Sequence, residues 1–255
     1  MGTITFENVS KTFVGRKEVR ALDSISLTIN EGEFVALLGP SGCGKSTLLN
    51  LLAGFEKKTE GTLLFDGQTV TRPGPDRGVV FQEAALFPWL NVWENVVFGP
   101  QVQGVARSDY ESRARGLLKL VGLEAFADAL PVQLSGGMRQ RVGIARVLAM
   151  SPRALLMDEP FGALDAQTRL AMQQLLLDVW QSLGTTVLFV THDIDEAILL
   201  SDRICVMSAR PGRIMRTIPI ALARPRSIAS LTSPEFMAYK AGIMSDMKID
   251  NIHQT

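Results

Sequence analysis

The chain has 255 residues, 46% of them hydrophobic, and its 26 Lys and Arg balance its 26 Asp and Glu. This composition is typical of a folded globular protein and excludes a disordered chain, a collagen and a strongly basic nucleic-acid binder. The best uncharged apolar runs, such as residues 84–93, stop short of the roughly 18 to 20 residues that a membrane-spanning helix needs. The N-terminal residues carry no export signal, and two cysteines are too few for a disulfide framework, so we expect a protein of the reducing cytoplasm.

The first predicted elements are a buried strand and a helix. Residues 33–38 (EFVALL) are almost entirely apolar and lie between two glycines, which indicates a strand covered on both faces. Residues 45–54 place leucines on one helical face and end at a glycine, which indicates a helix. Further on, residues 62–70 predict a hairpin around an Asp-Gly turn, and residues 78–82 predict another short strand.

The turn between this strand and helix carries a phosphate-binding pattern. Its sequence, GPSGCGKS at residues 39–46, fits G-x-x-x-x-G-K-[ST], and it lies between a strand and a helix as that mechanism requires. The glycines let successive backbone N–H groups and the helix N-terminus face a polyphosphate. Lys45 is expected to reach the terminal phosphates and Ser46 to ligate Mg²⁺.

The middle of the chain, residues 84–150, has helical character and is predicted to be a helical insertion. Ser108 and Glu111 have the spacing of a capping box at the start of one of its helices. The SGG sequence at residues 135–137 precedes another helix, with Ser135 as its N-cap and the glycines exposing backbone amides to an anion. An ordinary helix cap is the alternative interpretation of this sequence.

Buried-strand patterns return in the last third of the chain. Predicted strands at residues 154–158, 186–191 and 204–207 alternate with predicted helices at residues 166–183 and 194–201. This alternation is typical of an α/β fold with a parallel sheet. The last 40 or so residues give only weak signals.

The strand at residues 154–158 (ALLMD) is followed closely by two acidic residues, because Asp158 ends it and Glu159 comes next. The carboxyl end of a parallel strand is where such sheets bind ligands. The sequence resembles a Walker B strand, in which Asp158 would hold Mg²⁺ and Glu159 would face the water that attacks a γ-phosphate. A solvated pair of acids at the edge of a loop is the alternative interpretation.

Taken together, the motifs resemble the nucleotide-binding subunit of an ATP-binding cassette (ABC) transporter. The phosphate loop is followed, in the family's order and spacing, by LSGGM at 134–138, LLMDEP at 155–160, ALD at 163–165 and THD at 191–193. The match covers residues 3 to about 216.

This resemblance implies a fold and an organisation. The fold is that of a P-loop NTPase, with a RecA-like parallel sheet core and an antiparallel β subdomain (residues 1–83 and 151–220). An α-helical subdomain with the signature motif is inserted into it (residues 84–150), and a short C-terminal extension follows (residues 221–255). The resemblance further implies a homodimer of ATPase subunits, in which the signature helix of one copy completes the ATP site of the other.

The resemblance also implies roles for individual residues. Glu159 is implied as general base or water-orienting group, with Gln82 and His192 as the other catalytic residues. Mg²⁺ is implied to bind Ser46, Gln82 and Asp158. ATP is implied to contact Phe13, Gly39, Pro40, Ser41, Gly42, Cys43, Gly44, Lys45, Ser46, Thr47, Ser135, Gly136, Gly137 and Asp165.

Structural alternatives remain for several of these residues. Phe13, expected to stack on adenine, is alternatively a core residue, and His192 is alternatively a structural histidine after a strand. Asp165, expected to cross the dimer interface, also suits a helix N-cap. Met138 and Gly162 depart from the commoner Gln and Ser of the family, but neither departure removes a catalytic group.

The segment after Gln82 indicates which kind of ABC protein this is. Trp89 and Trp93 lie where family members receive a coupling helix from the membrane subunit, although packing within the helical subdomain is an alternative. With DRGVVFQ at residues 76–82 and ARPGR at 209–213, this segment resembles the importer branch for nitrate, sulfonates and taurine. The resemblance implies two membrane-spanning permease subunits, a solute-binding protein and a peripheral place on the cytoplasmic face of the inner membrane. A soluble non-transport ABC ATPase and an exporter subunit are the alternatives.

A basic segment, residues 203–234, holds six arginines and no acidic residue. A solvated basic face is the favoured interpretation, over a surface for anions or lipid headgroups. No function is assigned to it from the sequence.

Overall fold

The computed structural model describes residues 2–252, so the last three residues of the expected C-terminal extension lie outside the described residues. The chain divides into two compact units: one consists of the residues up to 73 and from 184 onward, and the other of residues 74–183. Within residues 2–252, each helix is too short or too polar to span a bilayer.

An antiparallel sheet opens the first unit. Strands β1 (Ile4–Val14), β2 (Glu18–Ile29), β4 (Glu60–Phe65) and β5 (Gln68–Thr69) lie in the order β2-β1-β4-β5. The predicted Asp-Gly turn joins β4 to β5, with φ angles of 49° and 74° at its two residues. These positive angles are the ones that a two-residue hairpin turn needs.

The predicted buried strand lies among parallel neighbours in the first unit. Strand β3 (Phe34–Leu38) pairs in parallel with β8 (Thr186–Thr191) and β9 (Arg203–Met207), and β10 (Ile214–Pro219) is antiparallel to β9. Every residue of β3 and β8 is buried. Strands of this kind need a covering layer on each face, which explains why they are continuously apolar.

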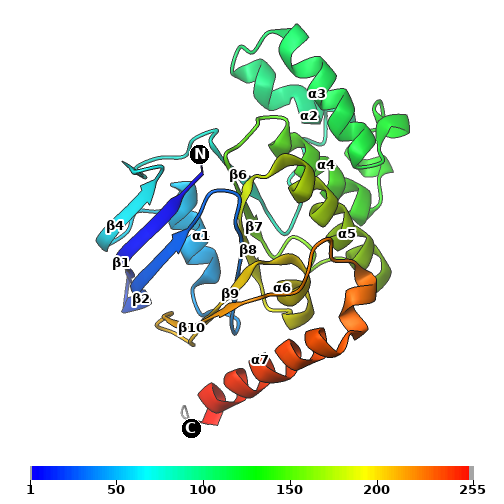
Figure 1. Cartoon of the computed structure of the whole chain (residues 1–255). Helices are drawn as coiled ribbons and strands as arrows, with labels where there is room; N and C mark the ends of the chain where they lie inside the picture. The colour runs from blue at the N-terminus through cyan, green and yellow to red at the C-terminus, as the bar shows by residue number, and fades with distance from the viewer. Residues whose placement is uncertain (1, 253–255) are drawn as a thin grey trace. The chain divides into compact units, whose positions relative to one another are not determined.

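Helices supply these layers (Figure 1). Helix α1 (Lys45–Ala53) lies between the parallel strands and the antiparallel sheet, and α6 (Ile194–Leu200) packs against β3 and β8 on the other side. After a 3-10 turn at Ile228–Thr232, α7 (Pro234–Ile252) packs against α6. The sequence pattern predicts α1 and α6 but not the two elements of the C-terminal extension.

The second unit holds two parallel strands and a layer of helices. Strands β6 (Arg77–Val80) and β7 (Ala154–Asp158) pair in parallel. The helices of this unit are α2 (Val92–Val102), α3 (Arg107–Leu120), α4 (Gly136–Leu148) and α5 (Ala166–Leu183), with short 3-10 turns at Glu124–Phe126 and Pro131–Gln133. Helix α4 contacts all three other helices and β6, which places it at the centre of the unit. The two units together confirm the predicted α/β class with an antiparallel sheet and a helical insertion.

One predicted helix start is wrong. Helix α3 begins at Arg107, so Ser108 lies inside the helix and does not cap it. Glu111 accepts hydrogen bonds from Arg107 and Arg115, one turn away on either side, and these bonds lower the pKa of Glu111 to about 2. The i,i+4 ion pairs therefore engage the side chain that the predicted capping box needs.

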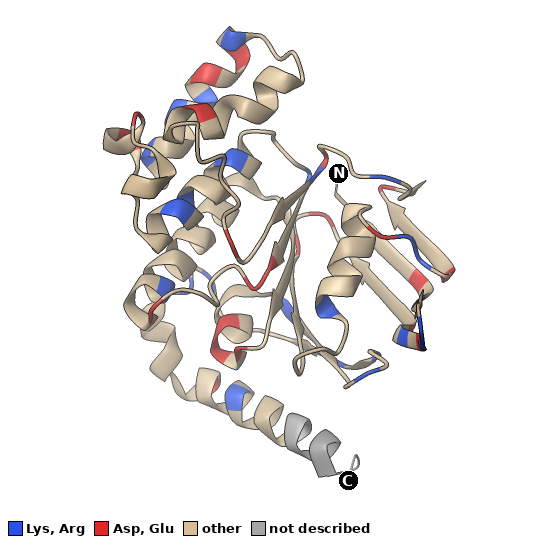
Figure 2. Ribbon diagram, turned by 180° about the vertical axis from the view of Figure 1, so that it is seen from behind, with Lys and Arg blue, Asp and Glu red and all other residues tan. Residues whose placement is uncertain are grey.

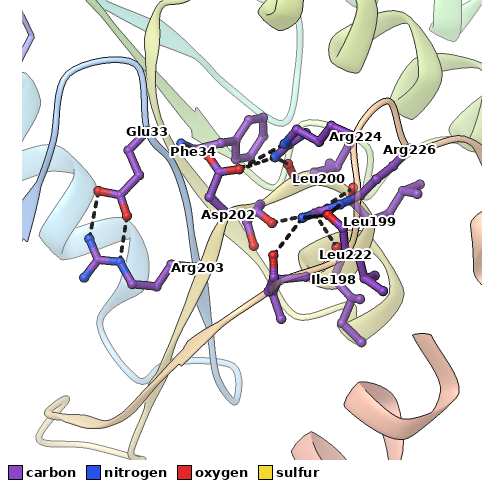
Figure 3. Close-up of polar contacts among 12 residues, drawn as sticks. Glu33, Phe34, Ile198, Leu199, Leu200, Asp202, Arg203, Leu222, Arg224 and Arg226 are labelled. Carbon is purple, nitrogen blue, oxygen red and sulfur yellow. Dashed lines mark hydrogen bonds and ion pairs between the residues drawn. The ribbon is translucent and has the colours of Figure 1, made fainter. Parts of the chain in front are cut away.

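The expectation of a solvated basic face is wrong for half of the six arginines of residues 203–234. Arg210, Arg213 and Arg216 are exposed, but Arg203 and Arg224 are half-buried and Arg226 is buried. Basic residues are distributed over both units (Figure 2). Several arginines of this segment bind acidic partners within the first unit: Arg203 lies 2.8 Å from Glu33, Arg224 lies 2.6 Å from Asp202, and Arg213 pairs with Asp23 (Figure 3 shows the first two). The acidic partners lie outside the segment, which is why its composition alone indicates a basic surface.

Candidate active site

The phosphate-binding turn between β3 and α1 curls around the side chain of Lys45. The ammonium group is buried and donates to the carbonyl oxygens of Gly39 and Pro40 at 2.8 and 3.0 Å. Gly44 caps α1 at a φ of 102°, and a Cβ there would lie 2.7 Å from the Leu22 side chain. Only glycine fits this position, because it alone tolerates both the angle and the close approach. The positive charge is therefore held inside the loop.

The ARPGR segment at residues 209–213 packs against the same turn. Arg210 donates to the carbonyl oxygen of Gly42 at 3.3 Å, and a Cβ on Gly212 would lie 2.1 Å from the carbonyl oxygen of Cys43. Neither contact is predicted from the sequence. Its only local signal is the Pro-Gly pair, which indicates a tight turn but not what the turn packs against.

His192 leaves the parallel strands beside this turn. Leu38 and Thr191 are paired in the register of β3 and β8, so the phosphate-binding turn and His192 follow neighbouring strands at the same edge. The backbone N–H of Asp193 donates to Thr191 Oγ1 at 3.0 Å, and the Asp193 carboxylate caps the first turn of α6. The structure thus brings the turn and His192 together and fixes the backbone on both sides of the histidine.

Phe13 lies near the end of β1, with 39% of its surface exposed. The Lys11 ammonium lies 4.5 Å from the centre of its ring, which is within the range of a cation–π contact. Lys11 is held in turn by Glu56 at 2.9 Å and by the carbonyl oxygen of Lys57 at 2.8 Å. The exposure of Phe13 argues against the alternative that it is a core residue. Lys11 helps to hold the Phe13 ring in place, a role that the sequence does not reveal.

In the second unit, Gln82 lies close to the turn that follows the acidic pair. Asp158 ends β7, and Gln82 follows the neighbouring strand β6 by two residues. A Cβ on Gly162 would lie 3.1 Å from Gln82 Nε2, so the glycine leaves space for the amide. Glu159 has a φ of 44°, which is uncommon for a residue with a side chain. Strained backbone of this kind is concentrated at functional sites.

Asp165 and the SGG sequence both lie at helix starts of the second unit. Asp165 accepts the N–H of Thr168 at 3.0 Å, a bond that lowers the pKa of Asp165, and thereby caps α5 as its structural alternative predicts. Ser135 caps α4 by accepting the N–H of Met138 at 3.2 Å, also as predicted. A Cβ on Gly137 would lie 2.5 Å from Thr168 Cγ2, so glycine permits these two helix starts to meet.

Helix α4 also holds the backbone around Gln82, through two residues that the sequence analysis missed. Gln140 donates to the carbonyl oxygen of Phe81 at 3.0 Å. Arg146 donates to the carbonyl oxygens of residues 84 and 85 at 3.1 and 2.8 Å, and burial lowers the pKa of its guanidinium. Their acceptors are backbone groups, which have no signature in a sequence.

Next along the chain, an aromatic patch of Phe87, Trp89 and Phe98 lies on the second unit. The ring centre of Phe87 is 5.6 Å from that of Trp89 and 4.5 Å from that of Phe98, and Trp89 is 72% exposed. Trp93 instead packs within the helical layer, where the Arg115 guanidinium lies 5.0 Å from its ring. The alternative of internal packing therefore holds for Trp93 but not for Trp89.

Known proteins with sequences similar to this chain are described as ATP-binding proteins. The family model described as ABC transporter matches residues 22–162. An uncharacterized ABC transporter ATP-binding protein of Methanocaldococcus jannaschii is 51% identical to this chain, over 95% of the chain and 90% of its own length. The taurine import ATP-binding protein TauB of Pseudomonas aeruginosa is 49% identical, over 88% of the chain and 86% of its own length.

Solved structures with a similar fold also come from ABC proteins. A dimeric ATP-binding cassette in a post-hydrolysis state, bound to ADP and Pi, has a TM-score of 0.74 at 37% identity and covers 86% of this chain and 100% of its own. The CbiO1 protein of Clostridium perfringens, part of the ABC transporter complex CbiONQ, has a TM-score of 0.77 at 28% identity and covers 99% of this chain and 98% of its own.

Proposed function

The chain belongs to the ABC transporter family as an ATP-binding ATPase subunit, and from this premise we propose that it powers the import of taurine or a related sulfonate. The predicted P-loop NTPase fold, with a RecA-like core and an antiparallel subdomain, is confirmed by the same membership. The similarity to taurine import ATP-binding proteins along most of the chain is the observation that carries the cargo class. The wider proposed class is that of small oxyanion-type solutes, which includes nitrate as well as taurine and other sulfonates.

ATP is proposed to bind at the turn between β3 and α1. Its phosphates would replace the carbonyl oxygens of Gly39 and Pro40 as partners of the Lys45 ammonium, because ionised oxygens form the stronger hydrogen bonds. Phe13 would stack on the adenine with the ring face that Lys11 does not cover. The proposed ATP contacts thus come from the loop, the end of β1 and the start of α1.

Hydrolysis is proposed to be an in-line transfer of the γ-phosphoryl group to water. A bond forms between the water oxygen and the γ-phosphorus while the bond to the β,γ-bridging oxygen breaks, which yields ADP and phosphate. Glu159 would accept a proton from the water or orient it, and Gln82 and His192 would hold the water and the γ-phosphate in line. Fixed partners of this kind stabilise the transition state because they need no rearrangement during the reaction.

Mg²⁺ is proposed to bind together with ATP. No cluster of three or more His, Cys, Asp or Glu side chains suited to a metal ion occurs within residues 2–245, the part whose side chains are described. Mg²⁺ prefers oxygen ligands, which are available on Ser46, Gln82 and Asp158. These three residues would be enough, because a Mg²⁺ ion bound with ATP would take its remaining ligands from phosphates and water. The ion would neutralise charge on the phosphates.

Two copies of the chain are proposed to share each ATP. The helix start at Ser135, Gly136 and Gly137 suits a phosphate but contains no lysine of its own. In a head-to-tail pair, this start from one copy would contact the γ-phosphate bound to the other copy, with Asp165 at the interface. A similar ATP-binding cassette has been solved as a dimer bound to ADP and Pi, which supports a pair of copies. Two permease subunits and a solute-binding protein would complete the importer, with this chain on the cytoplasmic face of the membrane.

The exposed patch around Trp89 provides the test of the transporter role. In a reconstituted complex with the permease and solute-binding proteins from the same gene cluster, we expect Trp89→Ala to lower taurine uptake by about tenfold or more, as loss of a central aromatic does at interfaces. Its ATPase rate without partners should stay within about twofold of normal, because Trp89 has no proposed contact with ATP. The measurements are uptake of labelled taurine and steady-state phosphate release.

Phe126→Ala is the matched control, because Phe126 is also an exposed aromatic of the second unit but lies outside the patch. Normal uptake by Trp89→Ala would reject the patch as the docking site. If the chain binds none of the membrane subunits and its ATPase rate ignores them, the soluble ABC ATPase becomes the better assignment. Export of the solute would instead support the exporter alternative.

Cys43 provides a test of the nucleotide site. Its thiol lies 4.0 Å from the Lys45 ammonium, and the residue as a whole is 1% exposed, so we expect alkylation by a small maleimide to be slow and to abolish hydrolysis. Bound ATP should slow this inactivation several-fold by closing the loop around phosphate. Cys205 is a poor competitor for the reagent, since burial raises the pKa of its thiol. A Cys43→Ala variant should resist inactivation, and full activity after confirmed alkylation of Cys43 would refute the prediction.

A further inference from the structure

Two arginines of the C-terminal extension cap the end of α6. The last carbonyl groups of a helix have no partner within the helix and need donors from elsewhere. Arg226 donates to the carbonyl oxygens of Ile198 at 3.0 Å, Leu199 at 3.4 Å and Ser201 at 2.6 Å, and Arg224 donates to that of Leu200 at 2.9 Å (Figure 3). Four consecutive carbonyls therefore depend on residues that lie 24 to 28 positions later in the chain.

Arg226 joins this helix end to the extension itself. The residue is 2% exposed, and its guanidinium also donates to the carbonyl oxygens of Ile220 at 2.9 Å and Leu222 at 3.1 Å. Burial lowers the pKa of Arg226 to about 10, so the group remains protonated at neutral pH. The planar fork of donors of an arginine suits this task, since it reaches acceptors on two segments at once.

The start of α6 is held by α7. Lys240 on α7 lies 2.8 Å from Asp195 in the first turn of α6. Figure 2 shows a basic position on α7 and acidic positions on α6. The backbone N–H of Ala221 donates to the hydroxyl of Tyr239 at 3.0 Å, which ties α7 to the beginning of the extension. The extension therefore contacts α6 at both ends.

Helix α6 determines where the backbone of His192 lies. With seven residues, α6 is too short to keep its shape without tertiary contacts. Its N-cap, Asp193, directly follows His192, and the Thr191 hydroxyl donates to Glu196 in its first turn at 2.6 Å. A displacement of α6 therefore moves the residues on both sides of His192.

We propose that the C-terminal extension positions His192 for the γ-phosphate by holding α6 at both ends, with Lys240 and Arg226 as positioning residues. The inference rests on the role proposed above for His192. It gives the extension a part in the reaction that neither its composition nor its weak secondary-structure signal indicates. Lys240 is the better residue to test, because its ion pair is partly exposed and its loss leaves the buried contacts of Arg226 intact.

The test is a double-mutant cycle on the full-length chain, with Lys240→Met, His192→Ala and the combination of both. Single-turnover hydrolysis of radiolabelled ATP measures the chemical rate even in slow variants, and titration with a fluorescent ATP analogue measures binding. We expect Lys240→Met to lower the rate about 2- to 5-fold with binding unchanged, and Lys240→Arg to restore most of it. In the His192→Ala background, Lys240→Met should change the rate by less than about 1.5-fold, because the residue it positions is gone.

Arg107→Met is the matched control, since Arg107 forms a comparable partly exposed ion pair with Glu111 on α3, away from α6. It should leave the rate unchanged. Equal rate losses from Lys240→Met with and without His192, or a normal rate in Lys240→Met, would overturn the inference and leave the proposed ATPase mechanism intact. A normal rate in His192→Ala would instead remove His192 from the mechanism, and the inference with it.

Discussion

Replacement of Glu159 by glutamine is expected to lower the rate of ATP hydrolysis by about 10²- to 10⁴-fold, the range for loss of a general base. Glutamine has nearly the same shape but cannot accept a proton from the attacking water. Glu159 follows β7 directly, at the carboxyl end of a parallel strand, and its backbone has a φ of 44°. That conformation fixes the direction in which the side chain leaves the strand. ATP binding by this variant should be normal or tighter, because bound ATP is no longer turned over.

The measurement is phosphate release by the purified protein with Mg²⁺ and saturating ATP, alongside ATP binding by titration. Glu18→Gln is the matched control, since it removes an exposed carboxylate of β2 in the same way. The control should leave the rate unchanged, which excludes a general effect of lost negative charge. Turnover near the normal rate in Glu159→Gln would overturn the assignment and direct attention to Gln82 and His192 as the groups that act on the water.

The sequence is most informative where function depends on local geometry. The strand, turn and helix over residues 33–54 are predicted because an apolar run, a glycine pattern and a leucine-rich helix follow each other within one short segment. The Asp-Gly hairpin turn and the Ser135 cap are confirmed for the same reason, since each depends on residues within four positions. Short-range rules of this kind need no knowledge of the rest of the fold.

The sequence is least informative where backbone groups are the partners. Arg146 and Gln140 hold the segment around Gln82 through carbonyl oxygens, and any residue type offers a carbonyl. The predicted capping box at Ser108 and Glu111 fails for a different reason, because here a local sequence rule applies but gives the wrong result. Ser108 and Glu111 satisfy a local rule, but Arg107 and Arg115 compete for the same carboxylate within one turn. Local rules therefore fail where two of them apply to one side chain.

The partners of Arg226 are also backbone carbonyl oxygens, and most of them lie far away in the sequence, so no local rule reveals its role. Of the substitutions considered, the loss of Arg226 should lower the thermodynamic stability of the fold most. We expect Arg226→Met to lower the free energy of unfolding by about 3 kcal/mol or more, because buried carbonyl oxygens left without a donor cost about 1 to 3 kcal/mol each. Methionine fills much of the volume of the arginine side chain but offers no donor. The end of α6 and the segment at residues 220–222 would lose the group that joins them. For a chain of this size, the thermal midpoint should fall by roughly 6 to 12 °C.

Circular dichroism during heating, with and without ATP, measures this effect. Arg16→Met removes an exposed arginine from the turn between β1 and β2 and should change the midpoint by no more than about 2 °C.

Arg226→Lys separates charge from geometry, since it keeps the cation but cannot reach acceptors on two segments. If lysine preserves the midpoint, the positive charge at the helix end is what stabilises α6. If lysine destabilises nearly as much as methionine, the paired hydrogen bonds are responsible, as the distances of Arg226 to both segments predict. An unchanged thermal midpoint in Arg226→Met would contradict the conclusion that the hydrogen bonds of Arg226 hold the end of α6.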